Sequence, residues 1–228
     1  MRADAGEAAP ILAVSPHLDD VVFACGDLLG AHPGAVVVTV LAGRPAPGTP
    51  LAPWDADAGF RPGDDVIGAR RREDAAALRH LGARPVWLDF RDAQYEPPPA
   101  RAAVARALAA SIAAAHPTIV LVPLGLFHSD HALVHDAALD VRRGDGGRAW
   151  LAYEEPTYRR VPGALAARLA ALAARGVRAG RVPAPAPSAS AAKRAAVACY
   201  ASQLRALATP GRPGAAALLE PEGYWRLG

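Results

Sequence analysis

The chain has 228 residues, of which 52% are hydrophobic and 21% charged, and its formal net charge is +3 at pH 7. This length predicts a single domain at 1–228, with a core at about 11–207 and a C-terminal tail at 208–228. No apolar stretch reaches the ~20 residues of a membrane helix, the basic residues do not cluster as in a nucleic-acid-binding protein, and the two cysteines are too few for a disulfide framework.

Short apolar segments alternate with longer, helix-forming segments over residues 11–153. The short segments are almost entirely apolar, as strands are in a sheet that is covered on both faces. This alternation predicts an α/β fold: a single Rossmann-like domain with a mostly parallel sheet, flanked by helices and joined by right-handed crossovers. We expect strands at 11–15, 35–41, 85–88, 118–123 and 150–153, and helices at 21–31, 65–81, 99–115 and 130–142.

The other segments are less regular. Residues 43–63 are rich in proline and glycine and too long for a routine connection, so they form either a rim or lid of an active site or an insertion without a role. Residues 209–228 are also rich in proline and glycine, and their Tyr224 and Trp225 either rim the site or pack on the core. We further expect a helix at 163–175, an edge strand at 177–182, an extended proline-rich connector at 183–187 and a helix at 191–207.

Two clusters of acids and histidines follow two of the expected strands. The sequence SPHLDD at 15–20 follows the apolar run 11–14, and the sequence HSDH at 128–131 follows the apolar run 119–122. Open α/β sheets bind their ligands outside the carboxyl ends of the strands. We therefore expect the two clusters to share one site, although they lie more than 100 residues apart in the chain.

The spacing within the clusters favours a divalent metal. His17 and Asp20 are three residues apart, as are His128 and His131, so in a helical turn each pair shares a face and can converge on one point. Two histidines and one aspartate form a ligand set of catalytic zinc that leaves a position for water. Of the adjacent acids Asp19 and Asp20, one can bind the metal while the other acts as general base, because neighbouring side chains point apart.

Each of these features also has a purely structural interpretation. Asp or Ser directly before the apolar residues from Val21 onward is a common helix N-cap, and a histidine pair after a strand can be part of an ordinary polar loop. Cys25 could be a nucleophile, but it lies in an apolar, helix-forming run, which favours a buried and unreactive thiol. The presence of both clusters at strand ends favours the metal site.

At these residues the chain resembles the PIG-L/LmbE-like family of zinc-dependent N-acetylglucosaminyl deacetylases. The resemblance runs from about Ile11 to Gln203 and does not depend on one motif. The residues that carry it are PHLDD at 16–20 with Gly26, then Arg70, Glu73, Leu81 and Gly82, Asp92, HSDH at 128–131, YEEP at 153–156, and Lys193 through Tyr200, Ser202 and Gln203.

The resemblance implies a metal centre and a base. His17, Asp20 and His131 would bind Zn²⁺, with another divalent transition metal as an alternative occupant. Asp19 would be the general base that activates metal-bound water.

The resemblance also implies supporting roles. His128 would stabilise the oxyanion or protonate the departing amine, and Asp130 would orient a motif histidine through a hydrogen bond. Arg70 and Asp92 match positions that the family uses near the sugar. Both have a structural alternative, because Arg70 also begins a charged helix face and Asp92 can simply shape a turn.

These roles imply a hydrolase that removes the acetyl group from an N-acetylated amino sugar or its conjugate. The alternatives are an amidase acting on another sugar-linked amide, as mycothiol-conjugate amidases do, a non-haem Fe(II) oxygenase with the same ligand types, and a non-catalytic sugar-binding relative. The α/β pattern and the adjacent aspartates argue against the oxygenase, and the intact motif residues argue against lost activity.

We expect a small-molecule sugar as partner, no nucleic acid and no membrane span, and a cytoplasmic location because the N-terminus lacks the features of a signal peptide.

Overall fold

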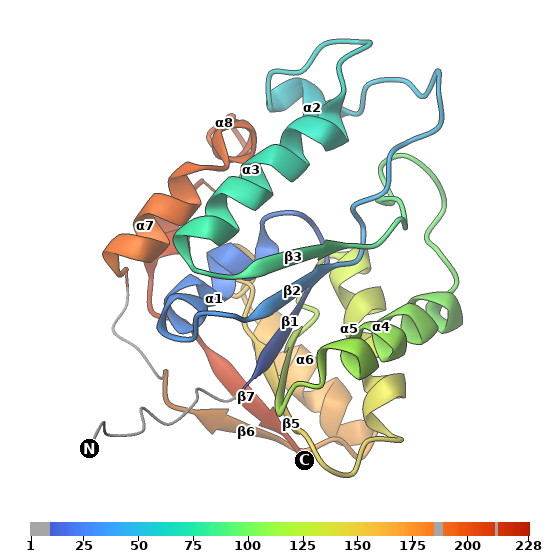
Figure 1. The fold of residues 1–228 in the computed structure, drawn as a ribbon, viewed down its shortest axis with the longest axis vertical. Helices are drawn as coiled ribbons and strands as arrows, with labels where there is room; N and C mark the ends of the chain where they lie inside the picture. Colours follow the sequence, from blue (N-terminus) through green and yellow to red (C-terminus); the bar gives the residue numbers. More distant parts are fainter. Residues whose placement is uncertain (1–9, 185–188, 213) are drawn as a thin grey trace, which may run out of the picture.

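A seven-stranded sheet forms the centre of the computed structural model, which describes residues 10–184, 189–212 and 214–228 (Figure 1). Its strands are β1 (Ile11–Ser15), β2 (Val36–Thr39), β3 (Arg84–Trp87), β4 (Ile119–Pro123), β5 (Ala149–Tyr153), β6 (Ala179–Val182) and β7 (Tyr224–Leu227). They lie in the order β3-β2-β1-β4-β5-β7-β6. The neighbouring strands β3, β2, β1, β4 and β5 are parallel to one another, while β7 runs antiparallel to both β5 and β6. The predicted α/β fold with a mostly parallel sheet is confirmed.

Helices cover both faces of this sheet (Figure 1). One face carries α1 (Asp20–Ala31), α3 (Val66–His80) and α7 (Ala191–Ala198), and the other carries α4 (Arg101–Ala115), α5 (Ser129–Arg142) and α6 (Ala164–Ala174). Alternate residues of β1 are divided between the two faces: Ile11 and Ala13 are buried against the first set of helices, and Leu12 and Val14 against the second. Burial on both faces explains why the central strands are almost entirely apolar.

The carboxyl ends of β1 and β4 lie side by side at one edge of the sheet. The two strands are parallel neighbours, with Ala13 of β1 opposite Leu121 of β4. The chain leaves β1 through α1 on one face and leaves β4 through α5 on the other. This divergence creates a crevice at the strand ends, which is where open α/β sheets bind ligands.

The observed elements differ from the expected ones mainly at their ends. The expected strand at 35–41 is shorter, Val36–Thr39, and the edge strand expected at 177–182 is present as β6. The expected helix at 191–207 is two helices, α7 and α8 (Ala201–Leu207), because Tyr200 between them leaves the helical conformation with φ −85° and ψ 56°. Most of the connector expected at 183–187 lies outside the described residues.

The C-terminal segment contributes to the sheet itself. After the short 3₁₀ helix η1 (Ala216–Leu219), β7 inserts between β5 and β6, an arrangement that the sequence analysis did not foresee. Tyr224 is buried and Trp225 is half-buried against the core, so packing is the correct one of the two interpretations of these aromatics. Among the described residues, none of the helices combines the length and apolarity needed to cross a membrane.

Candidate active site and metal centre

The first motif occupies the loop between β1 and α1. Asp20 is the first residue of α1 and Asp19 holds the N-cap position, but the side chain of Asp19 makes no capping hydrogen bond. Ser15 fixes this loop instead: its hydroxyl donates to the backbone carbonyl of His17 (2.6 Å) and accepts from the backbone N–H of Val21 (3.1 Å). The structure therefore gives no support to Asp19 as a helix cap.

The second motif begins α5. His128 is the N-cap residue, and its ring nitrogen Nδ1 accepts the backbone N–H of Asp130 (3.2 Å). In the neutral ring this contact places the proton on Nε2, which becomes a donor. Burial, followed by the charges of His17 and His131, lowers the pKa of His128 and so favours the neutral ring.

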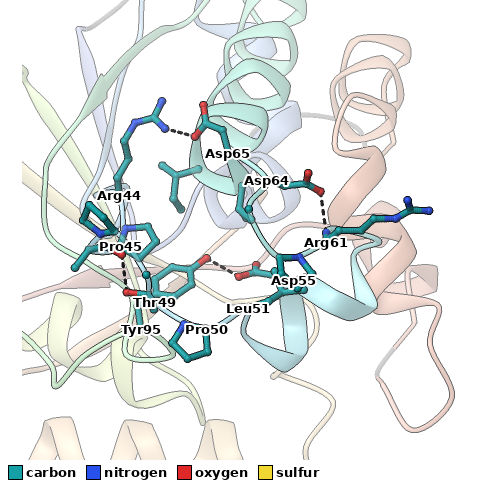
Figure 2. A pocket seen from close by; sticks show the side chains of 17 residues that line it. Arg44, Pro45, Thr49, Pro50, Leu51, Asp55, Arg61, Asp64, Asp65 and Tyr95 are labelled. Atoms are coloured by element: carbon teal, nitrogen blue, oxygen red, sulfur yellow. Dashed lines mark hydrogen bonds and ion pairs between the residues drawn. The ribbon is translucent and has the colours of Figure 1, made fainter.

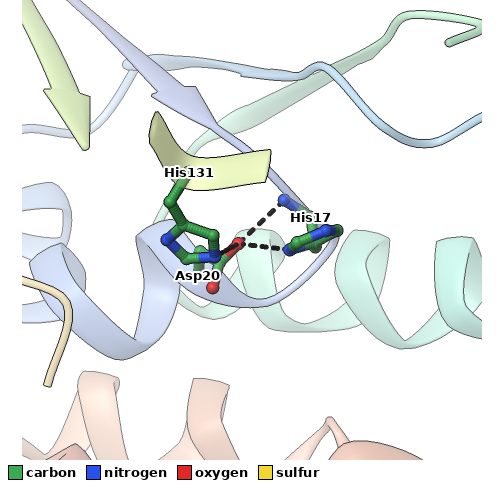
Figure 3. A group of neighbouring side chains, drawn as sticks. All are labelled: His17, Asp20 and His131. Carbon is green, nitrogen blue, oxygen red and sulfur yellow. Dashed lines mark hydrogen bonds and ion pairs between the residues drawn. The ribbon is translucent and has the colours of Figure 1, made fainter. Parts of the chain in front are cut away.

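Three side chains from the two motifs converge on one point (Figure 3). Oδ2 of Asp20 lies 3.1 Å from Nδ1 of His17 and 3.3 Å from Nε2 of His131, and the candidate ligand atoms all lie within 4.8 Å of one another. Ligands held at ~2.1 Å around a tetrahedral zinc are roughly 3.4 Å apart. Both the donor types and the spacing therefore fit a divalent metal such as zinc.

The second nitrogen of each of these histidines faces a carboxylate. Nε2 of His17 lies 3.1 Å from Oδ2 of Asp130 and 3.5 Å from Oδ2 of Asp92. Nδ1 of His131 lies 3.2 Å from Oε1 of Glu155. Carboxylates in these positions fix the orientation of a ligand ring and direct the lone pair of its other nitrogen to the metal. Asp130 thus contacts a motif histidine as expected, while Glu155 is a residue to which the sequence analysis gave no role.

Glu155 is itself held in place by the turn after β4. Its Oε1 accepts the backbone N–H groups of Gly125 (2.8 Å) and Leu126 (3.2 Å). Gly125 has φ 81°, and a Cβ atom there would lie 2.8 Å from the side chain of Arg168, so the turn requires glycine. Glu155 follows β5 just as the two motifs follow β1 and β4, and this position is the signal that could have identified it.

The adjacent acids differ in their electrostatic surroundings. Burial, and then the negative charge of Asp20, raises the pKa of Asp19 to about 6, against the opposing charge of Arg70. Burial also acts to raise the pKa of Asp20, but the charges and hydrogen bonds of His131 and His17 outweigh it and lower that pKa. Arg70, which is buried, places a guanidinium nitrogen 3.6 Å from Oδ1 of Asp19. This arrangement suits Asp19 to proton transfer and keeps Asp20 ionised.

Four motif residues, His17, Asp19, Asp20 and His128, line a cavity of about 280 Å³. Arg70 and Asp92 line it too, and Asp92 also shapes its turn by accepting the N–H of Gln94 (2.9 Å). The cavity is also lined by aromatic and amide side chains, which are typical of small-molecule sites. Lining residues that the sequence analysis did not single out for the site are Phe23, Trp54, Gln94, Thr157, Tyr158, Gln203 and Leu207.

The segment 43–63 forms walls of two hollows. Pro53 and Trp54, which belong to the short helix α2 (Pro53–Asp57), line the cavity at the metal centre, and the indole of Trp54 donates to Gln203 (2.8 Å). Residues 44–51 line a second hollow of about 390 Å³, which also includes Tyr95 (Figure 2). The segment therefore contributes to the rim of the site.

Comparison with known proteins identifies the family. Residues 12–142 match the PIG-L family model, which is described as GlcNAc-PI de-N-acetylase. Because this match spans more than half of the chain, the chain belongs to the PIG-L family, and the predicted family is confirmed.

Individual relatives agree with this assignment. The chain is 36% identical over 169 residues to 2'-N-acetylparomamine deacetylase from Streptomyces fradiae; the match covers 64% of this chain and 57% of that protein, so the chain spans a little over half of its length. It is also similar to the crystal structure of a triple mutant of a deacetylase of the teicoplanin biosynthetic pathway (TM-score 0.79, 26% identity, 96% and 98% of the two chains covered). A third relative is the A40926 pseudoaglycone deacetylase (TM-score 0.75, 28% identity, 96% of both chains covered). The predicted enzyme class agrees with the names of all three.

Proposed function

We propose that this protein is a metal-dependent N-deacetylase that removes the acetyl group from a small N-acetylated amino sugar or its conjugate. One observation carries the proposal: the candidate ligands His17, Asp20 and His131 converge on one point, and His17 and Asp20 line a cavity that also presents Asp19 and His128. A fold alone does not define an activity, so this constellation is the essential support. The deacetylase relatives agree with it.

The chain's residues divide the chemistry between them. A divalent metal such as zinc, held by His17, Asp20 and His131, would polarise the acetamido carbonyl and lower the pKa of water. Asp19 accepts the proton of the attacking water on its carboxylate. Arg70 contacts Oδ1 of Asp19 (3.6 Å) and keeps that carboxylate oriented.

His128 acts on the other side of the reacting amide. Its Nε2–H donates to the carbonyl oxygen while negative charge develops there, as donors of an oxyanion hole do. A C–O bond forms from water and the C–N bond breaks. The proton taken from water passes to the departing nitrogen, so the products are acetate and a free amine.

The substrate class follows from the cavity walls and from the relatives. The rings of Trp54 and Tyr158 offer apolar surface to a sugar ring, while Asp92, Gln94 and Gln203 offer partners to its hydroxyl or amino groups. A relative acts on 2'-N-acetylparomamine, and we propose a substrate of similar chemistry, an N-acetylated amino sugar joined to a further ring. The cytoplasmic location expected from the sequence stays a prediction.

A substrate panel tests the proposal. Purified protein loaded with zinc is incubated with 2'-N-acetylparomamine, N-acetylglucosamine and a sugar carrying a longer acyl amide, and amine release is followed with a fluorogenic reagent. We expect turnover of an acetamido sugar by the wild type and none by His131→Ala. Turnover of the longer amide alone would favour the amidase alternative, and an absence of amine release from all substrates would refute the proposal.

A further inference from the structure

Tyr158 lies against both histidines of the second motif. It follows β5 in a turn in which its backbone N–H donates to the carbonyl of Glu155 (3.1 Å). Its ring is nearly parallel to that of His128 (29°, centroids 6.1 Å apart) and nearly perpendicular to that of His131 (85°, centroids 5.2 Å apart). The ring therefore forms the wall of the cavity next to the two histidines, and Tyr158 shares this cavity with Asp19.

The hydroxyl of Tyr158 differs from those of the other four tyrosines. Each of the others donates to a fixed acceptor, at 2.6 to 2.8 Å: a carboxylate oxygen for Tyr95, Tyr200 and Tyr224, and the backbone carbonyl of Val14 for Tyr153. The part of the chain that the structure describes gives the Tyr158 hydroxyl no such acceptor. A donor that is left without a protein partner and lines a cavity is available to a ligand.

The surroundings of Tyr158 keep this hydroxyl protonated. Burial raises the pKa of Tyr158, and the negative charges of Asp20 and Asp19 add to the effect. The phenol of a tyrosine titrates at about pH 10 even in water, so at neutral pH Tyr158 is an O–H donor and not a phenolate.

We propose that Tyr158 is a second catalytic donor, whose hydroxyl donates a hydrogen bond to the acetamido carbonyl oxygen together with His128. The inference rests on the proposed deacetylase function. As the C–O bond forms, negative charge grows on that oxygen, and a second preorganised donor stabilises it more than it stabilises the neutral amide. Tyr158 keeps its proton throughout, and its ring lies nearly parallel to that of His128 in the wall of the same cavity.

The Tyr158→Phe variant separates this role from a structural one, because phenylalanine retains the ring that packs on the histidines. Removal of one such donor typically lowers kcat by about 10²–10³. We expect that loss in kcat, with KM within about threefold of wild type and with bound metal unchanged. Tyr224→Phe is the matched control, since it removes a hydroxyl that donates to Glu222 outside the cavity. Its kcat should equal that of the wild type.

Binding of a transition-state analogue provides a second measurement. A methylphosphonamidate of the amino sugar carries tetrahedral, negatively charged oxygens, and Tyr158→Phe should weaken its Kd by about the factor lost in kcat/KM while leaving the Kd of the amine product unchanged. An unchanged kcat, or a loss seen only in KM, would overturn the catalytic role of Tyr158. A wild type that releases no amine from any acetamido sugar would overturn the proposed function and this inference together.

Discussion

Asp19 and Asp20 show how two identical neighbouring side chains acquire different properties. Asp20 lies 3.1 to 3.3 Å from ring nitrogens of His17 and His131, whereas the contact of Asp19 with a cation is the longer one to Arg70, at 3.6 Å. The pKa of Asp19 is raised to about 6 by burial and by the charge of Asp20. A ligand must stay ionised and a base must exchange protons, so the contacts suit Asp20 to the proposed role of ligand and Asp19 to that of base.

This division predicts different effects of substitution. Asp20→Ala removes a candidate ligand, so both bound metal and turnover should fall. Asp19→Asn keeps the size of the side chain but removes the basic oxygen, so bound metal should remain while kcat falls by about 10²–10⁴. Elemental analysis and kcat, measured on both variants, check the prediction. Near-normal turnover in Asp19→Asn would contradict the role of general base.

Glu155 should control metal affinity without touching the metal. Its Oε1 lies 3.2 Å from Nδ1 of His131, and replacement of such a carboxylate usually weakens metal binding by about 10–100-fold. We expect this loss for Glu155→Gln in a chelator competition titration. Glu154→Gln is the control, because Glu154 binds Arg181 and Trp225 instead. Equal affinities of the two variants would show that Glu155 has no such effect.

At the scale of elements, the sequence predicted the strands with a strong apolar pattern and missed β7. β1 and β4 are buried on both faces, so their residues are apolar except for Ser15 at the end of β1, and their positions could be read directly. β7 has only four residues, includes Arg226 and follows Pro221 and Gly223, so its short pattern resembles a loop. Its place between β5 and β6 depends on tertiary packing that no local pattern encodes.

The site likewise contains residues that the sequence pattern could place and residues whose position depends on tertiary packing. His17, Asp20 and His131 come together because both motifs follow adjacent parallel strands, a relation that sequence order and strand pattern predict. Tyr158 could not be placed, since a tyrosine five residues beyond the end of a strand has no distinctive spacing. Gln203 lines the cavity from α8, which follows the interruption of the helix at Tyr200, whose hydroxyl donates to a carboxylate of α3.

A buried ionic network ties β7 to the helical layer. Nζ of Lys193 lies 2.7 Å from Oε1 of Glu222 and 3.8 Å from Asp27, and Glu222 also accepts the hydroxyl of Tyr224 (2.6 Å) and the backbone N–H of Leu28 (3.1 Å). Because Lys193 and Glu222 are both buried, loss of one partner leaves an uncompensated charge.

We therefore expect Lys193→Met and Glu222→Gln each to lower the free energy of unfolding by about 3–5 kcal/mol. The double variant should lose clearly less than the sum, because it removes both charges. Urea denaturation of the three variants and the wild type measures these values. Additive losses would mean that the two side chains do not stabilise each other.

At the scale of the whole molecule, the site at the carboxyl ends of the strands brings together segments from most of the chain. The cavity takes residues from the loop after β1, from α2 and α3, from the loops after β3 and β5, from the N-terminus of α5 and from α8. No contiguous segment contains the site. Metal binding by His17 of one motif and His131 of the other should therefore stabilise the folded molecule as a whole, since the unfolded chain does not hold these ligands together.

The pH dependence of stability should reflect a buried histidine outside the metal centre. His135 is fully buried in α5, where its Nδ1–H donates to the backbone carbonyl of Pro123 (2.7 Å). Burial, and then the positive charge of Arg168, lowers its pKa to about 4. In the unfolded chain His135 takes up a proton near pH 6.5. Its contribution to stability is thus complete above pH 6.5 and is lost as the pH falls from 6.5 toward 4.

His135→Asn tests this prediction, because the asparagine amide can donate to the same carbonyl but does not titrate. Each pH unit below 6.5 corresponds to about 1.4 kcal/mol, so between pH 7.5 and 5.0 the metal-free wild type should lose about 2 kcal/mol more unfolding free energy than the metal-free variant. Urea denaturation at the two pH values gives this difference even if the variant is less stable at both. Equal losses in the two proteins would show that His135 is not the group that makes the fold sensitive to acid in this range.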